Sequence, residues 1–246
     1  MRLPLTDKVS LVTGSSRGIG AATALKLAEL GSDVALNFRT KAPRAQEVAE
    51  QIRALGRRVL AVQADLTLES DLTRMMATVQ QNFARLDILI LNASGGLEKG
   101  KAEDYAMALN NTAQLRTAEL ASRLMPRGSR IVFVTSHWAH FYGATPVAPS
   151  YEVVAKSKHA GEEALRSYAP ELENRGISLL IISGDAIEGT ITPRLLERQS
   201  PGVLTRRLGE TQTLPTVDEF AEAIAQTALD ATLPTGHVVF VGRTDH

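Results

Sequence analysis

The chain of 246 residues contains no cysteine. This absence excludes disulfide bonds, thiolate metal sites and cysteine nucleophiles, and it fits a reducing compartment such as the cytoplasm. An excess of one charge is also absent, because 27 basic side chains balance 27 acidic ones. We therefore expect neither nucleic acid nor a membrane surface as a partner. No residue pattern indicates a metal site.

Long apolar runs are missing as well. No segment approaches the roughly 18 apolar residues of a transmembrane helix, and the first residues lack the apolar run of a signal peptide. We expect a soluble, cytoplasmic protein. Hydrophobic residues make up 44% of the chain, which supports a large buried core. A single domain over residues 1–246 is favoured.

Short apolar runs alternate with amphipathic segments such as AATALKLAEL (21–30). Nearly continuous apolar strands separated by helical patterns are typical of a parallel sheet that is covered by helices on both faces. We predict an α/β protein, with a Rossmann-type, doubly wound parallel sheet of about seven strands. The runs are 9–14, 33–38, 58–63, 86–92, 130–136, 177–183 and 237–242.

One long region, 188–216, carries glycine and proline breaks between the sixth run and the last helical pattern. Long segments of this kind are often lids over a binding site. A surface excursion without a function explains the sequence equally well.

A glycine-rich segment, TGSSRGIG (13–20), directly follows the first apolar run and precedes a helical pattern. Glycines there allow a tight turn that brings backbone N–H groups and a helix N-terminus against a pyrophosphate. A glycine-rich turn alone is a weak signal, but its place between a strand and a helix is the required context. The predicted dinucleotide-binding residues are Gly14, Ser16, Arg17, Gly18, Ile19 and Gly20.

The end of the second run, NFRTKAPR (37–44), offers Arg39 and Lys41 but no acidic residue. An acid there would bind the adenosine ribose of NAD, whereas arginine accommodates the 2′-phosphate of NADP. Arg17 adds a second cation. We therefore predict NADP(H) as the cofactor, with an ordinary solvated loop as the alternative.

Two further segments follow apolar runs and are candidates for the adenosine end of this site. Asp65 is placed to contact the adenine amine, and the NASGG turn (92–96) is placed to pass close to the adenosine through Asn92, Ala93 and Gly95. Each feature is also compatible with simple turn chemistry.

The stretch SYEVVAKSKHAG (150–161) holds one tyrosine and two lysines in a helical pattern. A helix turns about 100° per residue, so Lys156 points about 140° away from Tyr151, while Lys158 lies about 20° off the same face. A lysine side chain that leans toward the helix N-terminus covers much of the remaining distance. Helix phase therefore pairs Tyr151 with Lys158, although both lysines are alternatively ordinary solvated charges.

These features together resemble the short-chain dehydrogenase/reductase family over nearly the whole chain. The resemblance implies a nicotinamide cofactor, a tyrosine proton donor and, by analogy, a homo-oligomer such as a dimer or tetramer. It also implies that Ser136 binds the substrate oxygen and that Asn110 bends its helix, with Asn111 as the competing assignment. The motifs that carry it are TGSSRGIG, Asp65, NASGG, Asn110, Ser136 and the tyrosine–lysine helix.

The chain departs from the commonest family motif, Tyr-x-x-x-Lys, because Ala155 stands where that lysine belongs. Aligning on SKHA (157–160) instead places Val154 at the tyrosine position. The enoyl-acyl-carrier-protein reductases of this superfamily use a tyrosine, six residues and a lysine, and YEVVAKSK fits that spacing. The segment SGDAIEGT (183–190) also resembles their NADPH-dependent, ketoreductase-like branch.

A second departure is the segment HWAHFYGATPVAP (137–149), which separates Ser136 from Tyr151 by more residues than either branch leads us to expect. This insert puts the role of Ser136 in question. Its candidate substrate-pocket residues are Trp138 and Tyr142, together with His137 and His140, which are more often structural in such a setting.

We favour NADPH-dependent reduction of the C=C bond of an enoyl thioester. Tyr151 would donate to the enolate oxygen, and Lys158 would hold the cofactor ribose and lower the pKa of the tyrosine. The resemblance further implies that the Ile187 backbone binds the carboxamide and Thr190 a phosphate. The alternatives are a ketone or aldehyde reductase, or the reverse alcohol dehydrogenase, with the same pair, and a non-catalytic NADP(H)-binding protein.

Overall fold

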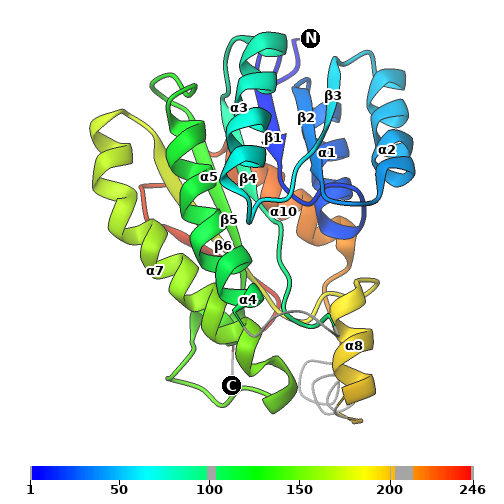
Figure 1. Cartoon of the computed structure of the whole chain (residues 1–246), viewed down its shortest axis with the longest axis vertical. Coiled ribbons are helices and arrows are strands. Elements are labelled where there is room, and N and C mark those ends of the chain that lie inside the picture. Colours follow the sequence, from blue (N-terminus) through cyan, green and yellow to red (C-terminus); the bar gives the residue numbers. More distant parts are fainter. Residues whose placement is uncertain (1, 99–103, 200, 203–212, 245–246) are drawn as a thin grey trace.

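The computed structural model describes residues 2–98, 104–199, 201–202 and 213–244. Its strands form one parallel sheet in the order β3-β2-β1-β4-β5-β6-β7 (Figure 1). The predicted doubly wound α/β fold is thereby confirmed. The strands are β1 (Val9–Val12), β2 (Asp33–Phe38), β3 (Val59–Gln63), β4 (Ile88–Leu91), β5 (Arg130–Ser136), β6 (Ser178–Gly184) and β7 (Val238–Val241).

The strands follow the apolar runs to within two residues at each end. The largest differences, of two residues, lie at the end of the first run and at the start of the fourth. The first run was drawn to residue 14, but β1 ends at Val12 because Gly14 adopts a positive φ of 65°, which is outside the strand region.

Side chains of alternate strand residues pack into two separate cores, one on each face of the sheet. Leu11 packs into the core beneath α3, α5 and α7, whereas its neighbour Val12 packs into the core beneath α1, α2 and α10. These helices are α1 (Gly18–Glu29), α2 (Ala42–Ala54), α3 (Glu69–Phe83), α5 (Ala113–Ser122), α7 (Glu152–Asn174) and α10 (Val217–Leu229).

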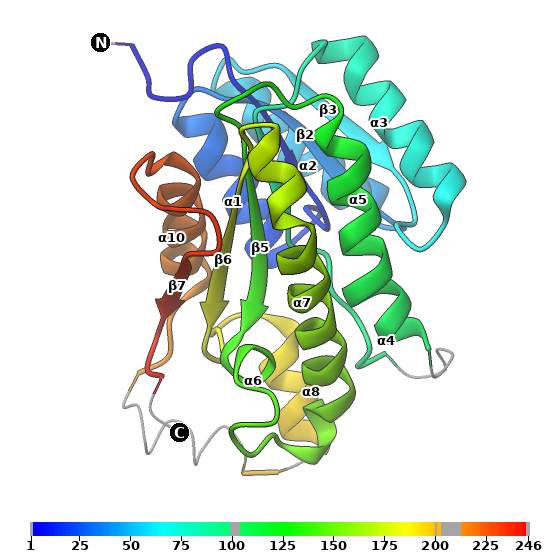
Figure 2. The same cartoon turned by 90° about the vertical axis from the view of Figure 1, so that its left-hand side faces the viewer.

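The chain winds outward from β1 in both directions, because β2 and β4 are its two neighbours. A crevice is expected at such a switch point, beyond the carboxyl ends of the strands. Short elements gather at this end of the sheet (Figure 2). They are α4 (Tyr105–Met107), the π-helix η1 (Ala108–Thr112), α6 (His137–His140), the 3-10 helix η2 (Pro149–Tyr151) and α8 (Ile191–Gln199).

The region predicted to be irregular, 188–216, is partly helical. It contains α8, and a bridge between Glu188 and Thr216 joins its two ends. Thr216 then begins α10 with a capping box to Glu219. Residues 200 and 203–212 of the predicted lid lie outside the described residues.

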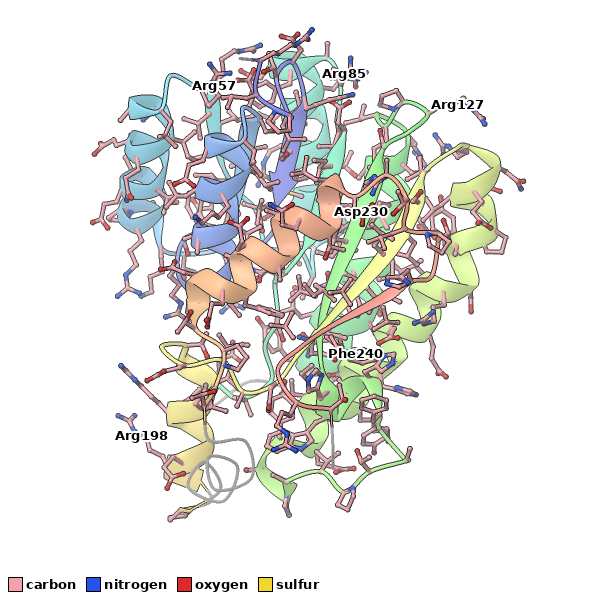
Figure 3. The ribbon with its side chains drawn as sticks, turned by 180° about the vertical axis from the view of Figure 1, so that it is seen from behind. Arg57, Arg85, Arg127, Arg198, Asp230 and Phe240 are labelled. Atoms are coloured by element: carbon pink, nitrogen blue, oxygen red, sulfur yellow. The ribbon has the colours of Figure 1, made fainter. Side chains whose placement is uncertain are left out.

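The end of the sheet opposite the crevice carries basic side chains, among them Arg57, Arg85 and Arg127 (Figure 3). Arg85 is paired with the buried carboxylate of Asp87, with 2.5 Å between Nη2 and Oδ1. These arginines lie far from the crevice. Within the described ranges, no helix is both long enough and apolar enough to cross a membrane.

Candidate active site

A cavity of about 780 Å³ lies at the switch point. Its walls come from the loop after β1, the ends of β2 to β6, and parts of α7 and α8. The cavity brings together most of the residues singled out in the sequence. Those that line it are Gly14, Ser16, Arg17, Gly18, Ile19, Gly20, Arg39, Asp65, Asn92, Ala93, Gly95, Ser136, Trp138, Tyr151, Lys158, Ile187 and Thr190.

The glycine loop has the bare backbone that a pyrophosphate needs. A Cβ atom on Gly20 would lie 2.5 Å from the carbonyl oxygen of Gly14, so α1 can begin this close only without a side chain. A Cβ atom on Gly18 would meet nothing within 4 Å, which leaves the helix N-terminus open to the cavity. This arrangement fits an anionic group at the N-terminus of α1.

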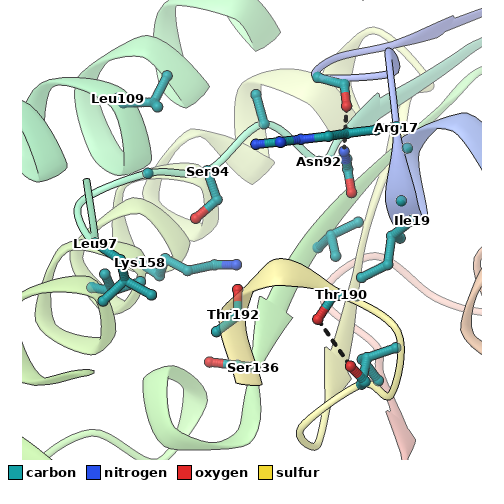
Figure 4. Close-up of a pocket in the computed structure, with 18 of the residues that line it drawn as sticks. Arg17, Ile19, Asn92, Ser94, Leu97, Leu109, Ser136, Lys158, Thr190 and Thr192 are labelled. Atoms are coloured by element: carbon teal, nitrogen blue, oxygen red, sulfur yellow. Dashed lines mark hydrogen bonds between the residues drawn. The ribbon is translucent and has the colours of Figure 1, made fainter. Parts of the chain in front are cut away.

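Asn92 holds this loop in place. Its side-chain amide donates to the carbonyl oxygens of Thr13 at 2.9 Å and Gly14 at 3.3 Å. The Thr13 hydroxyl in turn accepts from the backbone N–H groups of Asn92 and Ala93, at 2.9 and 3.0 Å. Asn92 therefore stiffens the loop beside the cavity (Figure 4).

Basic side chains line one end of the cavity. Arg39 donates a hydrogen bond to the hydroxyl of Tyr105, and Lys41 and Arg44 line the same end. Arg17 extends into the cavity from the glycine loop (Figure 4). This end can therefore accept a second anionic group besides a pyrophosphate.

Asp65 also lines the cavity, but one of its oxygens closes a turn. Its Oδ1 accepts from the Thr67 backbone N–H at 3.0 Å and from the Thr67 hydroxyl at 2.7 Å. The turn chemistry considered as the alternative for Asp65 is thus present in the structure.

Ser136 and Tyr151 meet in the cavity despite their separation in sequence. Ser136 ends β5, α6 and the turn that follows it carry the chain outward, and η2 returns it to Tyr151. The two hydroxyl oxygens are 3.3 Å apart. The insert that put Ser136 in question is therefore looped out and leaves the pair intact.

Tyr151 is 6% exposed, and its ring packs against the Trp138 ring with 5.3 Å between the centroids. Burial raises the pKa of Tyr151, and the hydrogen bond to Ser136 opposes this effect. The sequence led us to expect a lowered tyrosine pKa because of the nearby lysine. The net shift is upward instead, because burial outweighs the hydrogen bond to Ser136.

Lys158 lies in the cavity wall and is 8% exposed, whereas Lys156 is exposed on the other side of α7. The Lys158 side chain reaches toward the same space as Ser136 (Figure 4). Burial lowers the pKa of Lys158 to about 8, and the nearby Glu162 works against this shift. The helix itself begins at Glu152, because Tyr151 belongs to the preceding 3-10 turn, slightly later than the sequence pattern suggested.

Asn110 lies within the π-helix η1, behind the cavity wall. Its side-chain amide donates to the Gly95 carbonyl at 2.8 Å and to the Ser157 hydroxyl at 2.9 Å. Asn111, the competing assignment, donates instead to the sulfur of Met107 at 3.4 Å. Asn110 therefore connects η1 with the helix that carries Lys158, while Asn111 does not.

Two residues of the insert that were expected near the substrate lie elsewhere. The Tyr142 hydroxyl donates to Glu152 at 2.6 Å, and its ring packs on His159, so the structure does not bring Tyr142 into the cavity. His140 Nδ1 lies 2.8 Å from Glu162 Oε1, also away from the cavity. His137 does line the cavity, with its Nδ1 2.7 Å from the Ser183 hydroxyl.

Sequence reasoning missed several lining residues. Val154 had a usable signal, because it lies three residues after Tyr151 on the same helix face. Thr192 and Arg194 fall in the region interpreted as a lid, and Tyr105 had no local signal. The missed residues include Ser94, Leu97, Tyr105, Leu109, Val154, Asp185, Thr192, Arg194 and Phe220.

Comparison with known proteins agrees with this geometry. A family model described as short chain dehydrogenase matches residues 8–199. Hydroxynaphthalene reductase arp2 of Aspergillus fumigatus is 36% identical over 208 residues, which cover 81% of this chain and 74% of the relative.

Two solved structures are similar over nearly their whole length. A short chain dehydrogenase from Burkholderia cenocepacia in complex with NADP has a TM-score of 0.84 and 30% identity, covering 97% of this chain and 98% of that one. A blue fluorescent protein from a metagenomic library in complex with NADPH has a TM-score of 0.83 and 28% identity, with the same coverage of 97% and 98%. With its fold, glycine loop and family match taken together, the chain belongs to the short-chain dehydrogenase/reductase family of oxidoreductases.

Proposed function

We propose that the protein is an NADP(H)-dependent reductase of ketones, with Tyr151 and Ser136 as the groups that bind the carbonyl oxygen. The observation that carries this proposal is the 3.3 Å separation of the two hydroxyls at the cavity wall. A ketone oxygen accepts two hydrogen bonds, and two hydroxyls at this spacing can both donate to one oxygen.

NADP(H) is the cofactor that fits the site. The glycine loop would hold its diphosphate at the N-terminus of α1, and Arg39, with Lys41 and Arg44, would face the adenosine 2′-phosphate. No acidic residue follows β2 to bind the ribose hydroxyls of NAD. The similar structures with bound NADP and NADPH support the same choice.

When bound, the cofactor supplies the hydride for the carbonyl carbon. Tyr151 gives its phenolic proton to the carbonyl oxygen, on which negative charge develops. Its raised pKa keeps the phenol protonated at neutral pH, which is the form that a donor needs. Lys158 would hold the ribose hydroxyls and, as a cation, stabilise the phenolate left after the transfer.

The substrate side of the cavity favours a flat apolar ring. Trp138, Leu97 and Val154 pack around Tyr151 and line the cavity. The Aspergillus fumigatus relative is named as a reductase of hydroxynaphthalene, a fused aromatic ring system. A cyclic aryl ketone is therefore the substrate class that we propose.

Reduction of an enoyl thioester is the second candidate, because Tyr151 and Lys158 are separated by six residues. In that reaction Tyr151 would donate to the thioester oxygen, which lies about two bonds farther from the carbon that receives hydride.

The homo-oligomer, the cytoplasmic location and the lid role of 188–216 stay predictions.

The test is a substrate panel with both reduced cofactors, followed through NADPH absorbance. We expect turnover of a bicyclic aryl ketone such as α-tetralone with NADPH, little with NADH, and none of crotonyl thioester. Turnover of crotonyl thioester alone would favour the enoyl candidate. Tight NADPH binding without turnover of any carbonyl or enoyl compound would favour the non-catalytic alternative.

A further inference from the structure

Arg39 and Tyr105 meet across the basic end of the cavity. Arg39 follows β2, and Tyr105 begins α4 after the segment that leaves β4. Because β2 and β4 flank β1 on opposite sides, the two side chains come from opposite walls of the crevice. Their contact spans it.

The contact has two components. Arg39 Nη1 donates a hydrogen bond to the Tyr105 hydroxyl, and the guanidinium carbon lies 5.5 Å from the centroid of the Tyr105 ring. Burial raises the pKa of Tyr105, so the phenol stays neutral beside the arginine. A neutral hydroxyl orients the guanidinium without cancelling its charge.

The backbone around this pair fixes both partners. The side-chain amide of Gln63 donates to the Arg39 carbonyl at 2.8 Å. On the other wall, a Cβ atom on Gly95 would lie 3.0 Å from Tyr105 Cε1, so the ring rests against a residue without a side chain. Both side chains therefore start from constrained positions.

The hydrogen bond to Tyr105 uses one end of the guanidinium. The edge formed by Nε and Nη2 has the fork geometry that binds a phosphate through two parallel hydrogen bonds. An arginine that is already oriented loses less side-chain freedom when such a phosphate binds.

We propose that Tyr105 is a positioning residue, which holds Arg39 toward the adenosine 2′-phosphate and so sets the preference for NADP(H) over NAD(H). The proposal rests on the proposed function, in which Arg39 binds that phosphate. Tyr105 acts through Arg39 and needs no contact with the phosphate itself.

The test compares Tyr105→Phe with a matched variant, Tyr168→Phe. Tyr168 lies on α7, where its hydroxyl is 3.4 Å from that of Ser122, and it does not line the cavity. Dissociation constants for NADPH and NADH are measured by fluorescence titration of the purified proteins. We expect Tyr105→Phe to weaken NADPH about fivefold, the factor of one net hydrogen bond. It should leave the NADH affinity unchanged, and Tyr168→Phe should change neither cofactor's affinity.

Equal weakening of NADPH and NADH by Tyr105→Phe would overturn the proposal, because it would indicate general damage to the cavity. Tighter NADPH binding would also overturn it, because Tyr105 would then compete with the phosphate for Arg39. An unchanged NADPH affinity would show that Tyr105 has no positioning role.

Arg39→Ala separates this inference from the function on which it rests. If Arg39→Ala leaves NADPH binding unchanged, the 2′-phosphate assignment itself fails. If Arg39→Ala weakens NADPH but Tyr105→Phe does not, only the role of Tyr105 is wrong. In an Arg39→Ala background, Tyr105→Phe should have no further effect on NADPH affinity.

Discussion

The phenol of Tyr151 is the group whose removal separates chemistry from binding. Tyr151→Phe keeps the ring that packs on Trp138 and removes only the hydroxyl that meets Ser136. We expect kcat to fall by at least about 10²-fold, the usual contribution of a positioned proton donor. The NADPH dissociation constant should change little, which the same titration measures. A variant that keeps its kcat would remove Tyr151 from the chemistry.

Gly161 sets how closely α7 approaches the π-helix. A Cβ atom there would lie 2.0 Å from the Asn110 carbonyl oxygen, so α7 must shift to accept a side chain. We expect Gly161→Ala to cost about 1–3 kcal/mol in the free energy of unfolding. Its kcat should also fall, because α7 carries Lys158.

Urea unfolding measures this cost, and Glu163→Ala on the exposed side of the same helix is the control. That surface change should stay within about 0.5 kcal/mol of the wild type. Equal stability of the two variants would mean that the helices separate without cost.

At the scale of elements, charged and polar groups on α7 and α6 surround Lys158 and influence its pKa. Glu162, one turn beyond Lys158 and 4% exposed, lies 2.8 Å from His140 Nδ1 and accepts from Arg166 Nε at 3.0 Å. Its negative charge opposes the effect of burial on the pKa of Lys158, which is about 8. His140, which belongs to the insert after β5, thus contacts Glu162 from outside the cavity and acts on Lys158 only through this carboxylate.

Glu162→Gln should therefore lower the pKa of Lys158 below its present value. Lysine is charged only below its pKa, so the alkaline limb of the kcat/KM profile should move to lower pH in this variant. The matched control is Glu163→Gln on the same helix. Glu163 is exposed, and its Oε1 lies 3.6 Å from Nε2 of His159. A shift to higher pH, or the same shift in both variants, would contradict the role of Glu162.

Local patterns in the sequence predicted those parts of the site that depend on local geometry. The apolar runs and the glycine loop predicted residues that line the cavity, and helix phase favoured Lys158, which lies in the cavity wall, over the exposed Lys156. The meeting of Ser136 with Tyr151 depends on the path of the insert, which no periodicity encodes. The Arg39–Tyr105 contact joins opposite walls of the crevice, and the raised pKa of Tyr151 follows from burial. Both needed the tertiary structure.

At the scale of the whole molecule, the cavity is lined by both halves of the sheet, from Arg39 beyond β2 to Ile187 beyond β6. A ligand that binds there stabilises the folded chain by about 2.7 kcal/mol at 100 times its dissociation constant. For a protein of this size, the melting temperature should rise by roughly 5–10 °C.

Thermal unfolding followed by circular dichroism tests this expectation. At equal concentrations, NADPH should raise the melting temperature more than NADH, and Arg39→Ala should remove most of that difference. Equal shifts with both cofactors in the wild type would contradict the assignment of the basic end of the cavity.

The strand order also determines when β1 gains both of its neighbouring strands and can no longer pair with other chains. β1 precedes the other strands of the sheet along the chain, and all four of its residues are buried in the finished sheet. Its second neighbour, β4, begins only at Ile88, so the backbone N–H and C=O groups along one edge of β1 stay unpaired until the ribosome has passed that point. Unpaired edges of this kind recruit other chains. Refolding from urea should therefore give a lower yield at higher protein concentration, and fragments that end before β4 should precipitate.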